Sequence, residues 1–203
     1  MAELCKEFKC DKGPQSHHYY EVYDKYFAPR REEPINILEI GIWHGTSFDV
    51  WHEYFPNANI YGIDIFTRLK PEDVPALKKD RVHYVEADST KPDVAGKVRK
   101  AFGDVKFDFV IDDGLHDPNA NKLSFQFLFP FLADDGHYFI EDAWPLHIMT
   151  SKQLEHQWLQ KHPQRYNHFE MEKFLAEIEQ HNVEEFDLRS KGNPDSYIFK
   201  VTR

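Results

Sequence analysis

The stretch "INILEIGIWHGTSFDVW", residues 35–51, decides the fold. Residues 35–40 are aliphatic or β-branched at nearly every position, which predicts a buried strand. Two glycines bound a turn over residues 41–45, and apolar side chains then recur at helical spacing up to Pro56, which ends the helix. Strand, tight turn and helix together form the first unit of an α/β sheet.

The same alternation continues along the chain. Strands are predicted at residues 59–64, 81–88, 107–112 and 136–142, a helical turn at 75–79, helices at 91–102, 117–132 and 166–182, and an antiparallel hairpin at 183–203. Asp134 and Asp135 precede a glycine and are interpreted as turn residues, while residues 144–165 show no assignable pattern. We therefore predict one doubly wound α/β domain with a mainly parallel sheet, right-handed crossovers and a C-terminal antiparallel hairpin. Residues 1–34 form an N-terminal extension or lid, and residues 35–203 form the core.

Composition narrows the class of protein. A chain of 203 residues with 41% hydrophobic and 30% charged residues is typical of a soluble globular domain. The net charge of −10 argues against nucleic-acid binding, and no apolar run is long enough to span a membrane. The polar N-terminus predicts no signal peptide, and we expect Cys5 and Cys10 to be free thiols in the cytoplasm.

The glycine turn and the strand ends predict the kind of ligand. Gly41 and Gly45 match neither a dinucleotide fingerprint nor a phosphate-binding loop, so the turn either approaches a ligand or is an ordinary connection. Asp64 lies where an acid can accept both ribose hydroxyls, although a solvated strand end is the alternative. Four strands end in acids, namely Glu39, Asp64, Asp88 and Asp112. Such a rim disfavours NAD and ATP and suits a ligand with a ribose, an adenine and a positive charge.

The ordered motifs "LEIG-x-x-x-G-x-S", "YGIDI", "EADS", "FDFVIDDG" and "YFIED", followed by the hairpin, resemble a class I S-adenosylmethionine-dependent methyltransferase across residues 35–203. The resemblance implies a seven-stranded Rossmann-like sheet. It also implies that Gly41 and Gly45 line the methionine and ribose, that Glu39 supports the loop, and that Asp64 and Asp88 face ribose and adenine. Three further residues are assigned to the cofactor side, namely Ser47, Ser89 and Asp112.

A narrower resemblance concerns the last two acidic strand ends. "DDG-x-H", "IED" and the N-terminal "DKG…H-x-Y…VY" resemble the metal-dependent sugar O-methyltransferases of macrolide and related antibiotic tailoring. That family implies Mg²⁺ bound by Asp113, Glu141 and Asp142, with His116 as the base and Asp113 beside it in the catalytic set. It implies transfer of a methyl group from S-adenosylmethionine to a sugar hydroxyl of a glycoside, and it leaves a homo-oligomer open.

Elementary chemistry supports the same site. Clustered carboxylates make an all-oxygen site that suits Mg²⁺, Ca²⁺ or Mn²⁺ rather than zinc, and their mutual repulsion calls for a cation. A neutral imidazole at His116 can accept a proton, whereas the alternative is that His116 only caps the next helix. The segment His17–Tyr20 forms either a lid over the cofactor or a helix start with buried tyrosines. Four other histidines fit no ligand spacing, namely those at 147, 156, 162 and 168.

Other functions remain open at this point. A catechol-type or other small-molecule O-methyltransferase would use the same cation, and a hydroxylase-like or other non-methylating descendant would share the fold. A protein that holds the nucleoside without turnover is a further class, although the intact set of His116 and three acids argues against it.

Overall fold

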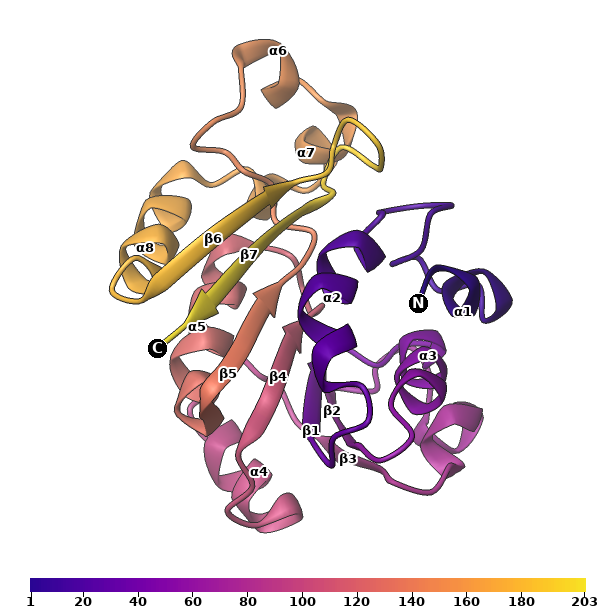
Figure 1. The fold of residues 1–203 in the computed structure, drawn as a ribbon. Coiled ribbons are helices and arrows are strands. Elements are labelled where there is room, and N and C mark those ends of the chain that lie inside the picture. The colour runs from indigo at the N-terminus through magenta and orange to yellow at the C-terminus, as the bar shows by residue number, and fades with distance from the viewer.

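A seven-stranded sheet runs through the centre of the computed structural model, which describes residues 1–203 (Figure 1). The strand order is β3-β2-β1-β4-β5-β7-β6. The strands are β1 (Asn36–Ile40), β2 (Asn59–Asp64), β3 (Val82–Glu86), β4 (Phe107–Asp112), β5 (Leu132–Ile140), β6 (Asn182–Asp187) and β7 (Tyr197–Thr202). Strands β1 to β5 pair in parallel, and β7 inserts antiparallel between β5 and β6. The predicted doubly wound sheet with a closing hairpin is confirmed.

Helices cover both faces of this sheet (Figure 1). The helices are α1 (Ala2–Glu7), α2 (Tyr20–Phe27), α3 (Thr46–Tyr54), α4 (Val94–Phe102), α5 (Pro118–Leu128), α6 (Ser151–Leu154), α7 (Gln157–Lys161) and α8 (His168–Ile178), with 3₁₀ turns at Ala28–Arg30, Pro71–Asp73, Pro75–Lys78, Phe129–Phe131 and Pro163–Arg165. Helices α1, α2 and α3 contribute to one core, and α4, α5 and α8 contribute to the other.

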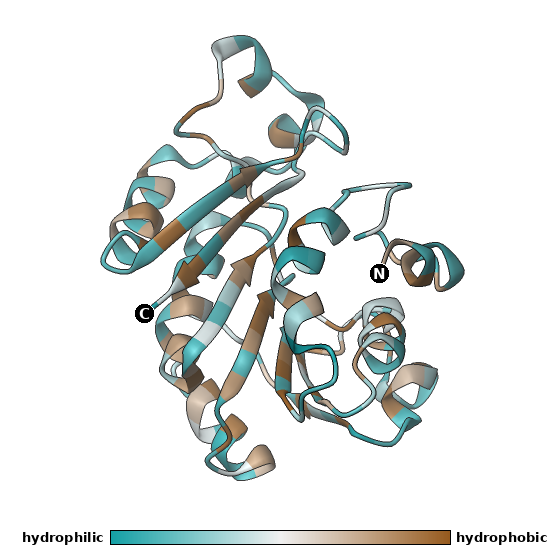
Figure 2. Cartoon of the chain, in the orientation of Figure 1, coloured by the Kyte–Doolittle hydropathy of each residue, from teal (hydrophilic) through white to brown (hydrophobic).

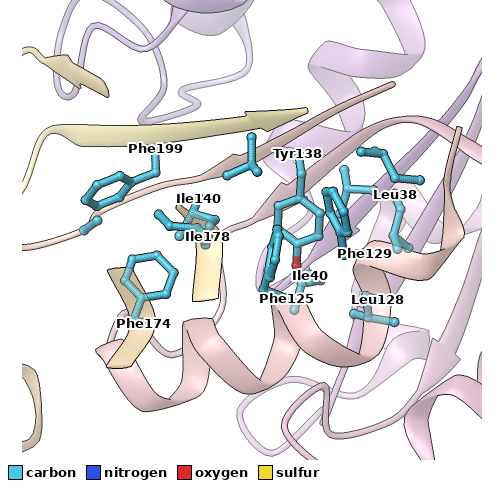
Figure 3. Close-up of a cluster of buried hydrophobic side chains, with 14 of the residues drawn as sticks. Leu38, Ile40, Phe125, Leu128, Phe129, Tyr138, Ile140, Phe174, Ile178 and Phe199 are labelled. Atoms are coloured by element: carbon cyan, nitrogen blue, oxygen red, sulfur yellow. The ribbon is translucent and has the colours of Figure 1, made fainter. Parts of the chain in front are cut away.

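The alternating side chains of each buried strand divide between these two cores. In β1, Leu38 packs with α4, α5 and α8, while Ile37 packs on the opposite face. Because both faces are covered, the central strands carry apolar residues on both faces, and Figure 2 shows brown segments along them between white and teal ones. Figure 3 shows part of the core to which α4, α5 and α8 contribute, where Phe125 and Phe129 from the α5 region flank Tyr138 of β5.

The structure differs from the prediction where local patterns were weak. Asp134 and Asp135 are not turn residues, because β5 begins at Leu132 and a register shift against β4 accommodates them within the strand. Strand β3 ends at Glu86, two residues before Asp88, and helix α5 ends at Leu128 before a 3₁₀ turn. The unassigned residues 144–165 contain α6, α7 and a 3₁₀ turn.

Two further observations concern the cysteines and the helices. Cys5 and Cys10 are both buried and unpaired by a disulfide, as predicted. No helix has both the length and the apolar character that a membrane crossing requires.

A histidine within the sheet predicts acid sensitivity. Burial lowers the pKa of His137 in β5 to about 4, helped by the cations of Lys200 and Arg30. The unfolded chain therefore binds more protons than the folded one between about pH 6.5 and 4, so stability falls as the pH drops through that window. We expect a loss of roughly 1 kcal/mol by pH 5, because solvent screens this half-buried ring. Urea melts at pH 5 and 7 should show that His137→Phe removes this part of the difference; an equal pH dependence in both proteins would contradict the assignment.

Candidate functional site

The candidate site lies where the parallel strands end at their carboxyl termini. The loop after β1 and the loop after β4 touch there, and Gly41 makes that contact possible. Gly41 has a φ of 91°, and a Cβ atom at this position would lie 2.2 Å from the backbone oxygen of Asp113. Only glycine allows both the positive φ and the close approach. The glycine turn and the acidic loop are therefore two parts of one site.

The acids assigned to the cofactor side shape their own loops. One carboxylate oxygen of Asp64 accepts from the backbone N–H groups of Ile42 and Trp43, at 2.7 and 3.2 Å. Its other oxygen accepts from Phe66 N at 2.6 Å. Asp88 accepts from the backbone and hydroxyl of Thr90. Asp64 thus holds the glycine turn in place at the end of β2.

The remaining cofactor-side residues lie around the same turn. Gly45, with a φ of 75°, is the N-cap of α3, and Ser47 is buried in the first turn of that helix. Ser89 follows Asp88, and its hydroxyl accepts a 2.7 Å hydrogen bond from Ser124 of α5. The loops after β1, β2 and β3 therefore contribute to one edge of the sheet.

Two acids beneath these loops are fully enclosed. Burial raises the pKa of Glu39 to about 7, although Lys12 and the indole of Trp51, which donates to Glu39 at 2.7 Å, oppose the shift. Burial likewise raises the pKa of Asp112 to about 7, against weak hydrogen bonds from Asn121 and Gly114. Asp112 thus lies behind the surface of the site, while the neighbouring Asp113 reaches it.

Asp113, His116 and Asp142 form a cluster at the ends of β4 and β5, here called the carboxylate–imidazole cluster. The His116 ring lies between the two acids, with Nε2 3.4 Å from Asp113 Oδ1 and Nδ1 3.2 Å from Asp142 Oδ2. One potential ligand atom from each residue lies within 4.8 Å of the others. All three side chains are partly exposed, at 22%, 15% and 17%, so a ligand can reach them.

Glu141, the third predicted carboxylate, lies deeper than the other two. Its Oε2 accepts a 2.5 Å hydrogen bond from Lys12 Nζ, and its Oε1 accepts from the Tyr23 hydroxyl. Burial raises the pKa of Glu141 well above its ordinary value. The structure therefore brings Glu141 next to the cluster but gives each of its oxygens a partner from the N-terminal segment.

Lys12 is the site residue that sequence reasoning missed. Burial alone would lower the pKa of its ammonium, but the carboxylates of Asp113, Glu141 and Glu39 outweigh burial and raise it well above the ordinary value. In turn, burial would raise the pKa of Asp113, but Lys12 and then His116 lower it overall. Two signals were available: clustered acids require a cation, and Lys12 lies in the N-terminal motif "DKG" of the resemblance, to which no role was assigned.

The segment before α2 forms one wall of the site. Tyr19 is buried and donates a 2.6 Å hydrogen bond to Asp142 Oδ1. His17 is also buried, with Nδ1 3.2 Å from the same oxygen and 2.9 Å from the Ser196 hydroxyl of the β6–β7 loop. The interpretation as a helix start with buried tyrosines is thus correct for Tyr19, whereas Tyr20, the first residue of α2, is only partly buried. The lid role stays a prediction.

His116 is not the cap of the following helix. Asp117 caps α5, its side chain accepting from Ala120 N at 3.0 Å, and Pro118 occupies the first helical position. His116 instead has a φ of 59°, which turns its ring towards the cluster. Of the other histidines, His147 pairs with Glu185, and His156 accepts from the backbone of Trp158; neither belongs to a metal-like cluster.

Because Asp117 is the N-cap of α5, replacing it should change the stability of the fold but not its chemistry. Asp117→Ala should cost about 1 kcal/mol in urea unfolding, because the N–H of Ala120 loses its acceptor. Asp117→Asn, which keeps an acceptor oxygen, should stay within a few tenths of a kcal/mol of the parent. A loss of similar size in both variants would show that the charge of Asp117 rather than its cap is important.

Comparisons with known proteins agree with this geometry. A family profile described as a methyltransferase domain matches residues 38–143. An 8-demethyl-8-(2-methoxy-α-L-rhamnosyl)-tetracenomycin-C 3′-O-methyltransferase from Streptomyces olivaceus is 31% identical over 71% of the chain and 37% of its own length. A demethylmacrocin O-methyltransferase from Streptomyces fradiae is 34% identical over 71% of the chain and 36% of its own length.

The chain is also similar to a solved methyltransferase structure. MycE methyltransferase from the mycinamycin biosynthetic pathway, in complex with Mg, S-adenosylhomocysteine (SAH) and mycinamycin VI, superimposes with a TM-score of 0.70 at 25% identity. The match covers 99% of this chain and 53% of MycE. The sheet is therefore a Rossmann-like methyltransferase fold. The chain belongs to the methyltransferase domain family, and it spans little more than a third of the length of the curated relatives described above.

Proposed function

We propose that this protein is an S-adenosylmethionine- and Mg²⁺-dependent O-methyltransferase that acts on a sugar hydroxyl of a glycoside or related natural product. The observation that carries the proposal is the contact between the glycine turn and the carboxylate–imidazole cluster, made at Gly41 and Asp113. A methyl donor on the turn and an acceptor on the cluster would thereby be neighbours. The relative from Streptomyces olivaceus, whose name specifies a rhamnosyl substrate and 3′-O-methylation, supports the acceptor class.

The acidic strand ends favour the cofactor. Asp64, Asp88 and buried Asp112 leave no cationic cradle for a phosphate, while acids can accept from ribose hydroxyls and an adenine amino group. Gly41 and Gly45 give the turn its shape, because a Cβ atom at Gly41 would meet Asp113 O and one at Gly45 would meet the side chains of Val74 and Ala76. In this proposal Asp64 holds the ribose directly and also fixes the turn through Ile42 N.

Cofactor binding can be measured directly. By calorimetry, SAH should bind and NAD should not. Asp64→Ala should weaken SAH binding by roughly 1.5–3 kcal/mol, tenfold to a hundredfold or more, because a charged acceptor is lost. Asp104→Ala, which removes an exposed acid in the loop before β4, is the matched control and should bind like the parent. Heat with NAD and none with SAH would contradict the cofactor assignment.

The residues present fit a divalent cation. Asp113 and Asp142 offer carboxylate oxygens from neighbouring strand ends, within reach of the His116 ring. Glu141 completes the proposed ligand set, because each of its oxygens keeps a second lone pair beside its present hydrogen bond. When bound, the cation would polarise the acceptor hydroxyl and lower its pKa.

Residues of the chain would remove the hydroxyl proton and hold the two reactants together. His116 lies beside the proposed ligands and takes the hydroxyl proton as the oxygen attacks the methyl group. Asp142, with Oδ2 3.2 Å from Nδ1, orients the ring. The strand ends hold acceptor and donor together, an effect worth up to roughly 7–11 kcal/mol of the barrier in good cases.

The acceptor class is tested by turnover. The parent protein with S-adenosylmethionine and Mg²⁺ should add one methyl group to an L-rhamnosyl glycoside, as seen by mass spectrometry. A catechol and the glycoside lacking the methylated hydroxyl are the comparison substrates. Methylation of the catechol alone would replace the sugar assignment with a catechol-type one.

A further inference from the structure

Lys12 is a fully enclosed lysine among the acids of the site. Its side chain is 1% exposed, and its Nζ lies 2.5 Å from Glu141 Oε2, 2.6 Å from Asp113 Oδ2 and 3.5 Å from Glu39 Oε1. The ammonium donates hydrogen bonds to Asp113 and Glu141, whereas Glu39 lies within ion-pair distance without a hydrogen bond. The three acids come from the ends of β5, β4 and β1, which are neighbours in the sheet.

The contacts of Lys12 determine how two proposed ligands are oriented. Asp113 turns Oδ2 to Lys12 and so leaves Oδ1 facing His116, 3.4 Å away. Glu141 is clamped between Lys12 and the Tyr23 hydroxyl. Neither carboxylate can rotate without breaking a buried, charge-assisted hydrogen bond.

Lys12 is itself held firmly by the N-terminal segment. The backbone oxygen of Lys12 accepts from Tyr20 N at 2.9 Å, and that of the preceding Asp11 accepts from His17 N at 2.9 Å. The Gln15 side chain donates to Cys10 O at 2.6 Å. A well-packed segment, rather than a flexible side chain alone, therefore places the ammonium.

We infer that Lys12 is a positioning residue of the cation site: it fixes the Asp113 and Glu141 carboxylates in the orientation that binds the divalent cation. The inference rests on the proposed function. It also makes the N-terminal segment an integral part of the site. A simple counter-charge role would have the opposite effect, because an ammonium close to a divalent cation repels it, so that its removal would tighten binding.

The test is Mg²⁺ binding by calorimetry, without cofactor or acceptor. Lys12→Met should weaken Mg²⁺ binding roughly 10- to 100-fold, the usual range when a group that orients a metal ligand is lost. The double variant Lys12→Met/Glu39→Gln removes one buried charge of each sign, so the formal charge of the cluster is unchanged. It therefore avoids the destabilisation that an unpaired buried carboxylate would cause. The double variant should be weakened in the same range, whereas a counter-charge role predicts parental affinity.

The control is Lys6→Met, which removes an exposed lysine of the same segment that pairs only with Glu3 and should leave Mg²⁺ affinity unchanged. Parental or tighter binding by either folded Lys12 variant overturns the inference. Absence of Mg²⁺ binding in the parent protein would instead overturn the cation part of the proposed function.

A measurement on the parent protein covers the case in which the variants do not fold. Lysines are reductively methylated with and without Mg²⁺ and read by mass spectrometry. Lys12 should stay unmodified in both conditions, because it keeps its carboxylates when the cation binds, while exposed Lys6 reacts in both. Modification of Lys12 on addition of Mg²⁺ would mean that the cation displaces it, and would overturn the positioning role.

Discussion

Chelation with EDTA is expected to abolish methyl transfer, and added Mg²⁺ is expected to restore it. In the proposed mechanism the carboxylates at the ends of β4 and β5 would hold the cation, which would supply several kcal/mol of transition-state stabilisation. The rate should therefore fall by at least about a thousandfold. SAH affinity should change little, because in the proposed function the loops after β1, β2 and β3 hold the cofactor rather than the cation.

The control for this prediction is Ca²⁺, which takes the same oxygen ligands with looser geometry and should restore less activity than Mg²⁺. Full activity in EDTA, with metal-free buffers verified by elemental analysis, would mean that Asp113, Glu141 and Asp142 are not catalytic metal ligands.

Replacement of His116 should have the second largest effect. If its imidazole is the general base, kcat should fall roughly 10²- to 10⁴-fold, while cofactor and acceptor affinities change little. His116→Asn is the better variant than His116→Ala, because asparagine tolerates the left-handed φ of 59° at this position.

His147→Ala is the matched control, since this ring pairs with Glu185 rather than with the carboxylate–imidazole cluster. It should retain parental kcat. Single-turnover rates and thermal melts on the same preparations separate chemistry from folding. A His116→Asn protein that is folded and turns over at the parental rate would remove His116 from the base role.

Local patterns were sufficient for most of the fold. The strand–turn–helix unit at residues 35–51, the cap at Asp117 and Pro118, and the closing hairpin each depend on neighbours in sequence, and the structure has all three. The prediction of a turn at Asp134 and Asp135 was wrong. It was made because two acids before a glycine are typical of a turn. In the structure they lie within β5, in the irregular stretch between Leu132 and His137, the residues that pair with Phe107 and Phe109 of β4.

The site was partly predictable for the same reason. Asp113, His116 and Asp142 follow apolar strands, so their meeting follows from a parallel sheet whose strands end at one edge. Lys12 lies 101 residues from Asp113 and 129 from Glu141, and its place depends on the packing of the N-terminal segment. No periodicity encodes such a contact. The surroundings of Glu141 were missed with it, because Tyr23 and Lys12 both come from that segment.

The most direct test is a crystal structure with SAH, a glycoside acceptor and Mn²⁺, which replaces Mg²⁺ and can be located by its anomalous scattering. We expect an Mn²⁺ peak between Asp113 and Asp142. The SAH sulfur should lie on the glycine turn next to the acceptor hydroxyl, and His116 should contact that hydroxyl. An Mn²⁺ peak elsewhere, or SAH bound away from the loop between Gly41 and Gly45, would contradict it.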